Sequence, residues 1–122
     1  MKLSIIATAL PVICLSSAAY ADGDAVAGKS VFNKCAICHS PAPGKNSVGP
    51  TLFGIVGRQS ASVDGFKYSD AMKAANKTWD AATLDVYLTN PKAMVPGTKM
   101  VFPGLPNPED RANVIAYLAT LK

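Results

Sequence analysis

The stretch Cys35-Ala36-Ile37-Cys38-His39 decides how this sequence of 122 residues is interpreted. His39 is the only histidine, which excludes every site that needs two imidazoles from one chain. Cys35 and Cys38 are so close in sequence that a disulfide between them would close a loop too small to stabilise a fold. With 49% hydrophobic and 16% charged residues, the chain has the composition of one packed domain rather than of a disordered segment. We therefore expect the two thiols and the imidazole to serve a chemical role.

Residues 1–21 are predicted to be a cleaved secretory signal peptide. Lys2 gives a positive start, a short apolar run follows, and Ala19-Tyr20-Ala21 matches the small-x-small pattern of a signal-peptidase site. The apolar run is shorter than the roughly 20 residues that an ordinary membrane-spanning helix needs. An uncleaved anchor is the alternative that stays open. Cleavage would remove Cys14 and leave residues 22–122 as one exported domain.

The spacing C-x-x-C-H is the attachment pattern of c-type haem, in which two thiols bind the ring and the adjacent histidine ligates iron. Three other sites compete for the same residues. A thioredoxin-like redox pair needs a βαβ context that is missing, and a zinc site needs a fourth ligand, for which residues 22–122 have no further cysteine or histidine. A simple disulfide leaves His39 without a role. The motif predicts one haem c, covalently attached through Cys35 and Cys38, with His39 on the iron.

Helical patterns stand at the two ends of the mature chain. Gly23-Asp24 begins a segment with apolar residues at helical spacing, which is expected to run into Cys35. Pro108-Glu109-Asp110 is a proline-plus-acid helix start. The helix that follows it is expected to present one apolar stripe, made of Val114, Ile115, Leu118 and Leu121.

The middle of the chain is expected to hold short helices between long loops. Ser69 can cap a helix through Ala75, and Asp80 can cap another that ends before Pro91. Proline and glycine are frequent in the stretches expected to be irregular, 41–57 and 91–108. This is an all-α pattern, and connections of such length indicate that the loops wrap around something.

The ligand on the other face of the iron would decide the function. An empty position permits ligand binding or enzymatic chemistry, whereas a strong second ligand leaves only electron exchange. With no second histidine, the candidates are Met72, Met94 and Met100, each of which could instead be core filling. Met100 follows Pro96-Gly97-Thr98-Lys99, a turn that can hold a thioether toward a central cofactor.

The sequence resembles the class I cytochromes c and looks like a soluble bacterial relative of mitochondrial cytochrome c. The resemblance covers residues 22–122 and implies an all-α cytochrome c fold, with crossed N- and C-terminal helices, short middle helices and long loops wrapped around one haem. Gly28 and Tyr117 would meet where the terminal helices cross. The motifs that carry the resemblance are Gly28, Phe32-Asn33-Lys34-Cys35, Cys38-His39, Gly49-Pro50, Gly57-Arg58, Gly65-Phe66-Lys67-Tyr68, Thr78-Trp79, Tyr87-Leu88, Asn90-Pro91-Lys92, Pro96-Gly97-Thr98-Lys99-Met100 and Ile115-Ala116-Tyr117-Leu118.

The resemblance also implies the axial ligands and their supports. His39 would be the proximal ligand, with the Pro50 carbonyl accepting a hydrogen bond from its second ring nitrogen. Met100 would be the distal ligand, and a His/Met pair raises the reduction potential. Tyr87 would place its hydroxyl near the Met100 sulfur, and Thr98 would help to hold the loop.

A second group of residues is implied around the haem propionates. Tyr68 and Trp79 would donate hydrogen bonds to a propionate, and Arg58 would lie near it, because a buried carboxylate needs such partners. Where many members of the family have an asparagine, this chain has Met72. The polar network near the haem is therefore expected to differ here.

The implied function is that of a one-electron carrier of the bacterial periplasm, and not of an enzyme. It would move electrons from a quinol-oxidising membrane complex to a terminal oxidase, a reductase or a photosynthetic reaction centre. Lys34, Lys92 and Lys99 would face acidic docking surfaces of such complexes, with only transient contact with the membrane surface. We expect a monomer and no nucleic-acid partner, since no basic helix is present. The alternatives are a haem enzyme or gas sensor with an open iron site, and a signal-anchored cytochrome domain.

Overall fold

The computed structural model describes residues 6–12 and 23–122, and residues 6–12 have no regular secondary structure. Cys14 and the predicted cleavage site at Ala19-Tyr20-Ala21 lie outside the described residues, so cleavage of residues 1–21 stays a prediction. In the described part of the chain, no helix is long and apolar enough to cross a membrane.

The two terminal helices are α1 (Ala25–Phe32) and α5 (Pro108–Ala119). Asp24 caps α1 by accepting hydrogen bonds from the main-chain N–H groups of Val26 and Ala27. Asn107 caps α5, which has proline at its first position and two acidic residues in its first turn, as the sequence predicted. Both helices are shorter than expected. The helix α1 ends at Phe32, and the chain from there to Cys35 forms hydrogen-bonded turns instead. The helix α5 ends at Ala119, before Leu121.

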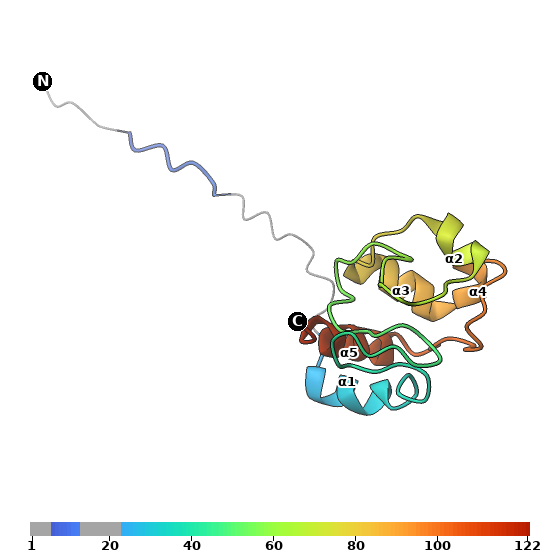
Figure 1. Ribbon diagram of the computed structural model, residues 1–122. Helices are drawn as coiled ribbons and strands as arrows, with labels where there is room; N and C mark the ends of the chain where they lie inside the picture. The colour runs from blue at the N-terminus through green and yellow to red at the C-terminus, as the bar shows by residue number, and fades with distance from the viewer. Residues whose placement is uncertain (1–5, 13–22) are drawn as a thin grey trace, which may run out of the picture.

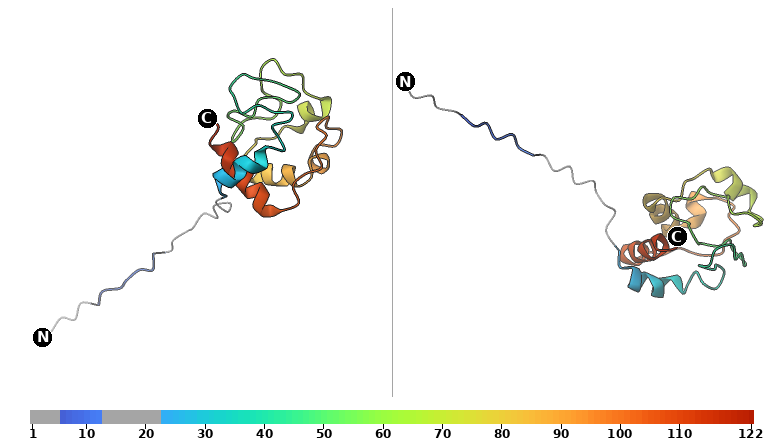
Figure 2. Two further views of the ribbon diagram at one scale, coloured as in Figure 1. Left: turned by 90° about the horizontal axis from the view of Figure 1, so that it is seen from below. Right: turned by 60° about the vertical axis from the view of Figure 1, so that its left-hand side comes forward.

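These helices cross in close contact, which is seen in Figures 1 and 2. Gly28 is buried at the crossing, where an added Cβ would collide with the Asn113 carbonyl and lie 3.0 Å from Tyr117 Cβ. The rings of Phe32 and Tyr117 pack with centroids 5.1 Å apart. The Asp24 main-chain N–H donates to Asn113 Oδ1 at 2.8 Å. The expected meeting of Gly28 and Tyr117 is confirmed.

Three short helices form the other half of the molecule. The first two are α2 (Asp70–Ala75) and α3 (Ala81–Thr89), and their caps are the predicted Ser69 and Asp80. The third is α4 (Pro91–Met94), which lies within the range 91–108 that was expected to be irregular. That expectation was wrong at its first residues. Asn90 ends α3 and then caps α4, and Pro91 suits the first position of a helix because no partner is needed for a main-chain N–H there.

The core joins both halves. Its buried apolar side chains are Phe32, Ile55, Trp79, Leu84, Tyr87, Leu88, Val95, Leu105, Val114, Ile115 and Leu118. No strand is present in residues 23–122 apart from an isolated bridge between Gln59 and Thr78, so the all-α prediction is confirmed. In Figure 1 the long irregular segment between α1 and α2 passes in front of α5 and α3.

Candidate functional site

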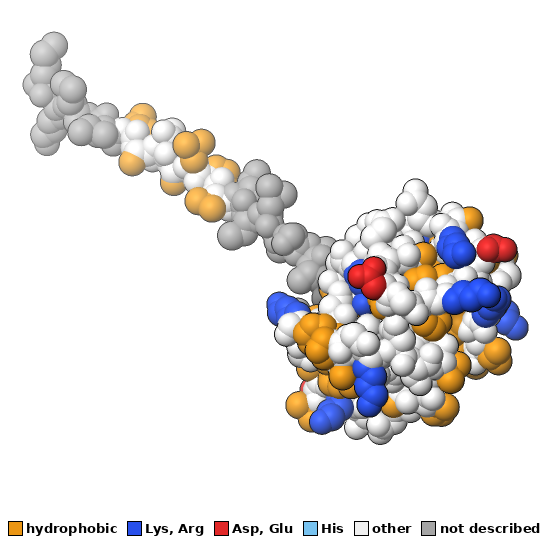
Figure 3. All heavy atoms as spheres, in the orientation of Figure 1, with side chains coloured by type: hydrophobic (Ala, Val, Ile, Leu, Met, Phe, Trp, Pro, Cys, Tyr) orange, Lys and Arg blue, Asp and Glu red, His pale blue; other side chains and the backbone are white. Residues whose placement is uncertain are grey.

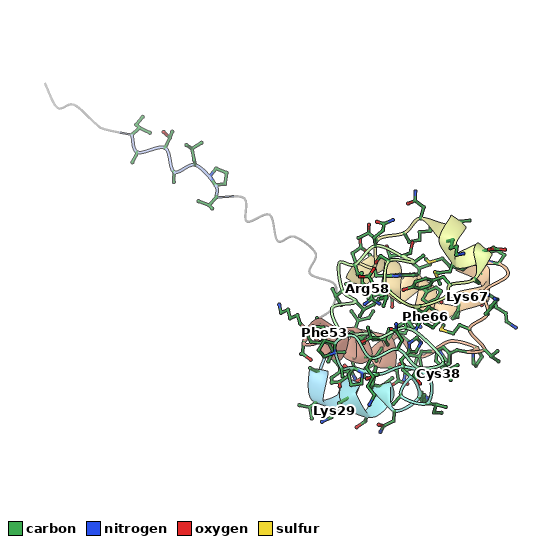
Figure 4. The ribbon with its side chains drawn as sticks, viewed as in Figure 1. Lys29, Cys38, Phe53, Arg58, Phe66 and Lys67 are labelled. Atoms are coloured by element: carbon green, nitrogen blue, oxygen red, sulfur yellow. The ribbon has the colours of Figure 1, made fainter. Side chains whose placement is uncertain are left out.

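The two thiols and the imidazole lie on consecutive turns that continue from α1. The Cys35 N–H donates to the Phe32 carbonyl at 2.7 Å, and the His39 N–H donates to the Cys35 carbonyl at 2.9 Å. Figure 4 shows Cys38 just beyond the end of α1, with Arg58 and Phe66 on the loops above it. Cys35 and Cys38 are half-buried and do not form a disulfide. Burial raises the pKa of the Cys35 thiol, an effect that the positive charge of Lys34 opposes.

His39 is fixed by main-chain groups. Its Nδ1 lies 2.7 Å from the Pro50 carbonyl oxygen, and because a carbonyl only accepts, Nδ1 must carry the proton. Burial lowers the pKa of His39, the hydrogen bond to Pro50 opposes this, and the nearby Arg58 charge lowers it further. The ring is therefore neutral near pH 7. Its Nε2 lone pair is left to bind a metal.

Met100 is held by two side chains from different elements. The Tyr87 hydroxyl, on α3, lies 3.8 Å from the Met100 sulfur and donates to it. The Met100 main-chain N–H donates to Thr98 Oγ1 at 3.2 Å. Burial raises the pKa of Tyr87, against a smaller opposing effect of the Thr98 hydroxyl, so the phenol keeps its proton. Met72 and Met94, the other candidates, are partly buried side chains packed against the core.

Main-chain pairing brings together Arg58 and Trp79, two of the three residues predicted to surround a propionate. The Trp79 N–H donates to the Arg58 carbonyl and the Gly57 N–H to the Trp79 carbonyl, both at 2.8 Å. The Arg58 guanidinium donates to two main-chain carbonyls, those of Thr51 at 2.9 Å and Phe53 at 3.0 Å. These bonds explain how Arg58 is held in its half-buried position.

The aromatic members of this group differ in their surroundings. Trp79 is buried, and its ring packs on that of Tyr87 with centroids 4.8 Å apart. The Tyr68 hydroxyl accepts a hydrogen bond from the Val63 N–H at 3.0 Å, which leaves its own proton free to donate. The Phe66 ring packs edge-on against the Tyr68 ring, with centroids 4.9 Å apart. Hydrogen bonding of Tyr68 and Trp79 to a propionate stays a prediction.

The donor set fits a haem c. It combines two thiols one turn apart, a neutral imidazole with its Nε2 free, and a thioether whose sulfur accepts a hydrogen bond. None of these donors is engaged in a disulfide or an ion pair in the described residues. His39 would hold the iron from one side and Met100 from the other, while Cys35 and Cys38 would bind the ring covalently.

Lys34, Lys92 and Lys99 are exposed, and the described residues contain one ion pair, between Arg111 and Asp85 at 2.8 Å. Most acidic side chains instead stand at helix starts, where they cap or complement the helix dipole: Asp24, Asp70, Asp80, Glu109 and Asp110. Within the described residues, Lys34, Lys92 and Lys99 therefore have no ion-pair partner. On the face shown in Figure 3 the basic side chains are spread over the surface rather than gathered at one point.

Two residues of the His39 loop were missed by the sequence analysis. Thr51 is buried, and its hydroxyl and main chain bond to Ala42, Asn46, Phe53 and Arg58. Asn46 joins Thr51 to the loop at Asp64, to whose carbonyl it donates at 3.1 Å. No local pattern marks either residue, because their partners lie up to 18 positions away in sequence.

Known proteins match this chain over nearly its whole described length. The cytochrome c family model matches residues 25–122. Cytochrome c2 of Rhodomicrobium vannielii is 56% identical over 98% of this chain and 94% of its own, and that of Rhodoblastus acidophilus is 54% identical over 82% and 94%. The structure of cytochrome cH from Methylobacterium extorquens superposes with a TM-score of 0.77 at 49% identity, over 80% of this chain and 99% of that one. The chain therefore belongs to the class I cytochromes c, a family of electron carriers, not enzymes, that hold haem c covalently.

Proposed function

We propose that this protein is an exported one-electron shuttle whose haem iron is ligated by His39 and Met100. The observation that carries the proposal is the double support of Met100. Tyr87 donates to its sulfur and Thr98 accepts from its main-chain N–H. A thioether held in this way would serve as the second protein ligand of a bound haem iron, which would leave electron transfer and prevent binding of oxygen or substrate.

The chain's own residues determine how the redox centre behaves. The bound haem supplies an iron that changes by one electron between its ferric and ferrous states. Pro50 fixes the tautomer and the ring orientation of His39, which keeps Nε2 in place through the cycle. Tyr87 donates a hydrogen bond to the Met100 sulfur, and with Met100 on the iron this bond would draw electron density from the sulfur and favour the reduced form. Rigid ligands keep the structural change between the two states small.

Replacement of Met100 tests the ligand assignment. In Met100→Ala, the oxidised protein should lose the methionine–iron charge-transfer band at the red end of its visible spectrum, and the reduced protein should bind carbon monoxide. Met72→Ala and Met94→Ala are matched controls, since both side chains are also partly buried against the core. Both controls should keep the band. A wild-type protein that is high-spin and binds carbon monoxide readily would instead indicate a haem enzyme or gas sensor.

We propose that the electron donor is a quinol-oxidising membrane complex and that the acceptor is a terminal oxidase, a reductase or a photosynthetic reaction centre. Lys34, Lys92 and Lys99, which are exposed and form no ion pair within the described residues, support docking to acidic surfaces of such complexes. Reaction rates with a purified complex should fall steeply as ionic strength rises. Lys92→Gln should make the rate less dependent on ionic strength. Lys122→Gln, which removes a lysine outside the proposed docking group, should have a smaller effect. Rates that are flat with ionic strength would contradict the docking assignment.

The site of action is proposed to be the periplasm of a bacterium. The short apolar run and the Ala19-Tyr20-Ala21 pattern support export with cleavage after Ala21. Mass spectrometry of the protein from its native host should give an N-terminus at Asp22. A mature protein that begins at Met1 and sediments with membranes would indicate the signal-anchored alternative.

A further inference from the structure

The peptide unit between Pro50 and Thr51 lies between two side chains. On one side, the Pro50 carbonyl accepts a hydrogen bond from His39 Nδ1 at 2.7 Å. On the other, the Thr51 N–H donates to Asn46 Oδ1 at 3.0 Å. The C=O and N–H of a trans peptide point in opposite directions, so one rigid plane connects the two bonds. The result is a continuous hydrogen-bonded chain from the Asn46 amide to the His39 ring.

The orientation of the Asn46 amide is determined by its partners. Its Oδ1 accepts from the Thr51 N–H, and its Nδ2 donates to the Asp64 carbonyl at 3.1 Å. A flipped amide would set a donor against an N–H and an acceptor against a carbonyl, so only one orientation is possible. The amide oxygen is thus held toward Thr51 from the far side of the loop.

The position of this segment does not depend on Asn46 alone. The Thr51 hydroxyl donates to the Ala42 carbonyl at 2.6 Å, and the Thr51 carbonyl accepts from Arg58 at 2.9 Å. The Gly49 N–H donates to the Cys38 carbonyl at 2.8 Å. These bonds place the loop against the His39 turn. The hydrogen bond to Asn46 differs from these, because it is made by the Pro50–Thr51 peptide, the same peptide whose carbonyl accepts from His39.

We propose that Asn46 is a positioning residue that tunes His39 through the Pro50–Thr51 peptide. Accepting a hydrogen bond from the Thr51 N–H polarises the peptide and increases the negative charge on the Pro50 oxygen. The bond from His39 Nδ1 becomes stronger, and the imidazole becomes a better electron donor through Nε2. This inference rests on the proposed function, in which His39 ligates the iron. A more electron-donating imidazole favours the oxidised state and lowers the reduction potential.

Two substitutions of Asn46 in the holoprotein test the proposal. Asn46→Leu is close in shape but accepts no hydrogen bond, so the midpoint potential should rise. In the reduced protein, the His39 ring N–H should exchange with solvent several-fold faster by NMR. Asn46→Asp still accepts from Thr51, now with a charge, but cannot donate to Asp64. Its potential should fall below that of the wild type.

Thr51→Val is the matched control for simple loosening of the loop. It removes the hydroxyl that bonds to Ala42 but keeps the main-chain N–H that bonds to Asn46. The melting temperature should fall while the potential stays at the wild-type value. A potential shift in Thr51→Val as large as in Asn46→Leu would show that loosening is the cause, and would overturn the proposal.

Other results would overturn it as well. The proposal fails if Asn46→Leu has the midpoint potential and the His39 ring exchange rate of the wild type. It also fails if the midpoint potential of Asn46→Asp is unchanged or raised. If Asn46→Leu fails to assemble with haem, the Asn46→Asp result decides. Failure of the proposed function is seen separately, because the wild-type protein itself would then lack the methionine–iron band.

Discussion

Residues 38–58, which include His39, are held by hydrogen bonds along their whole length. Residues 95–107, which include Met100, are held by hydrogen bonds mainly at their two ends. In the first segment, bonds made by Asn46, Thr51 and Arg58 link positions throughout the loop. In the second, the Val95 N–H donates to Pro91 at 2.9 Å and the Leu105 N–H donates to Leu88 at 2.7 Å.

Between those ends the Met100 segment makes few hydrogen bonds, although Met100 and Phe102 pack against the core. Thr98 and Tyr87 contact Met100 itself. Within the described residues, the main chain of residues 101–104 makes no hydrogen bond, and the Val101 side chain is 95% exposed. Local stability follows the density of such contacts. For the proposed ligand pair, the comparison therefore predicts that Met100 is released from the iron before His39 when the protein is perturbed.

The largest loss of stability is expected at Gly49, where the His39 ring leaves no room for a larger side chain. In Gly49→Ala, the new Cβ would lie 2.6 Å from His39 Nδ1 and 2.9 Å from Nε2. Gly49 has no positive φ, so the ring, and not the backbone, is the obstacle. We expect a loss of about 3 kcal/mol in the free energy of unfolding. The absorption spectrum of the haem should change as well.

Gly44→Ala separates this clash from general loop strain. Gly44 has φ 68° and no atom within 4 Å of an added Cβ. Its cost should be about 1 kcal/mol, from the left-handed backbone alone. The haem spectrum should be that of the wild type. A wild-type spectrum in Gly49→Ala would contradict the tight packing of the His39 side.

A smaller effect is expected at the end of the Met100 segment. Arg111 donates to Asp85 at 2.8 Å and to the carbonyls of Leu105 at 2.8 Å and Pro106 at 3.1 Å. Arg111→Met leaves a half-buried carboxylate and a buried carbonyl without these partners, at a cost of about 2 kcal/mol. In guanidinium chloride, the methionine–iron band should disappear at lower concentration than the helical circular dichroism.

Arg111→Lys is the control, since it keeps the charge but not the three-fold contact. The guanidinium chloride midpoints of Arg111→Lys, for both the methionine–iron band and the circular dichroism, should lie between those of the wild type and Arg111→Met. If the band and the circular dichroism shift together by the same amount in Arg111→Met, Arg111 stabilises the protein without holding the Met100 segment in particular.

The same contrast explains what could be predicted from the sequence. Ser69 and Asp80 cap their helices through hydrogen bonds to residues three positions ahead, so their starts were predicted correctly. The helix α4 was missed because Pro91 was interpreted only as the end of α3. A proline that follows a capping asparagine can equally begin a helix.

The site was predictable only in part for the same reason. Cys35, Cys38 and His39 form a contiguous motif, and Met100 follows a recognisable turn. Asn46 and Arg111 carry no such signal, because their roles arise from contacts with partners distant in sequence. Arg111 stands 26 positions from Asp85, and the pair forms only once α5 packs beside α3.

The smallest effect is expected at Thr98, inside the poorly supported segment. Thr98→Val keeps the shape but removes the acceptor for the Met100 N–H and the hydroxyl beside Tyr87. Because Thr98 is only partly buried and the ends of the segment stay in place, the free energy of unfolding should fall by only about 1 kcal/mol. The Met100 main chain should nevertheless be held less firmly once its N–H has lost this acceptor, so the methionine–iron band should be lost at a lower pH in an alkaline titration. Thr98→Ser, which keeps the hydroxyl, should titrate as the wild type does. If Thr98→Val titrates like the wild type too, Tyr87 and the two ends suffice to hold Met100, and the two segments differ less than their hydrogen bonds indicate.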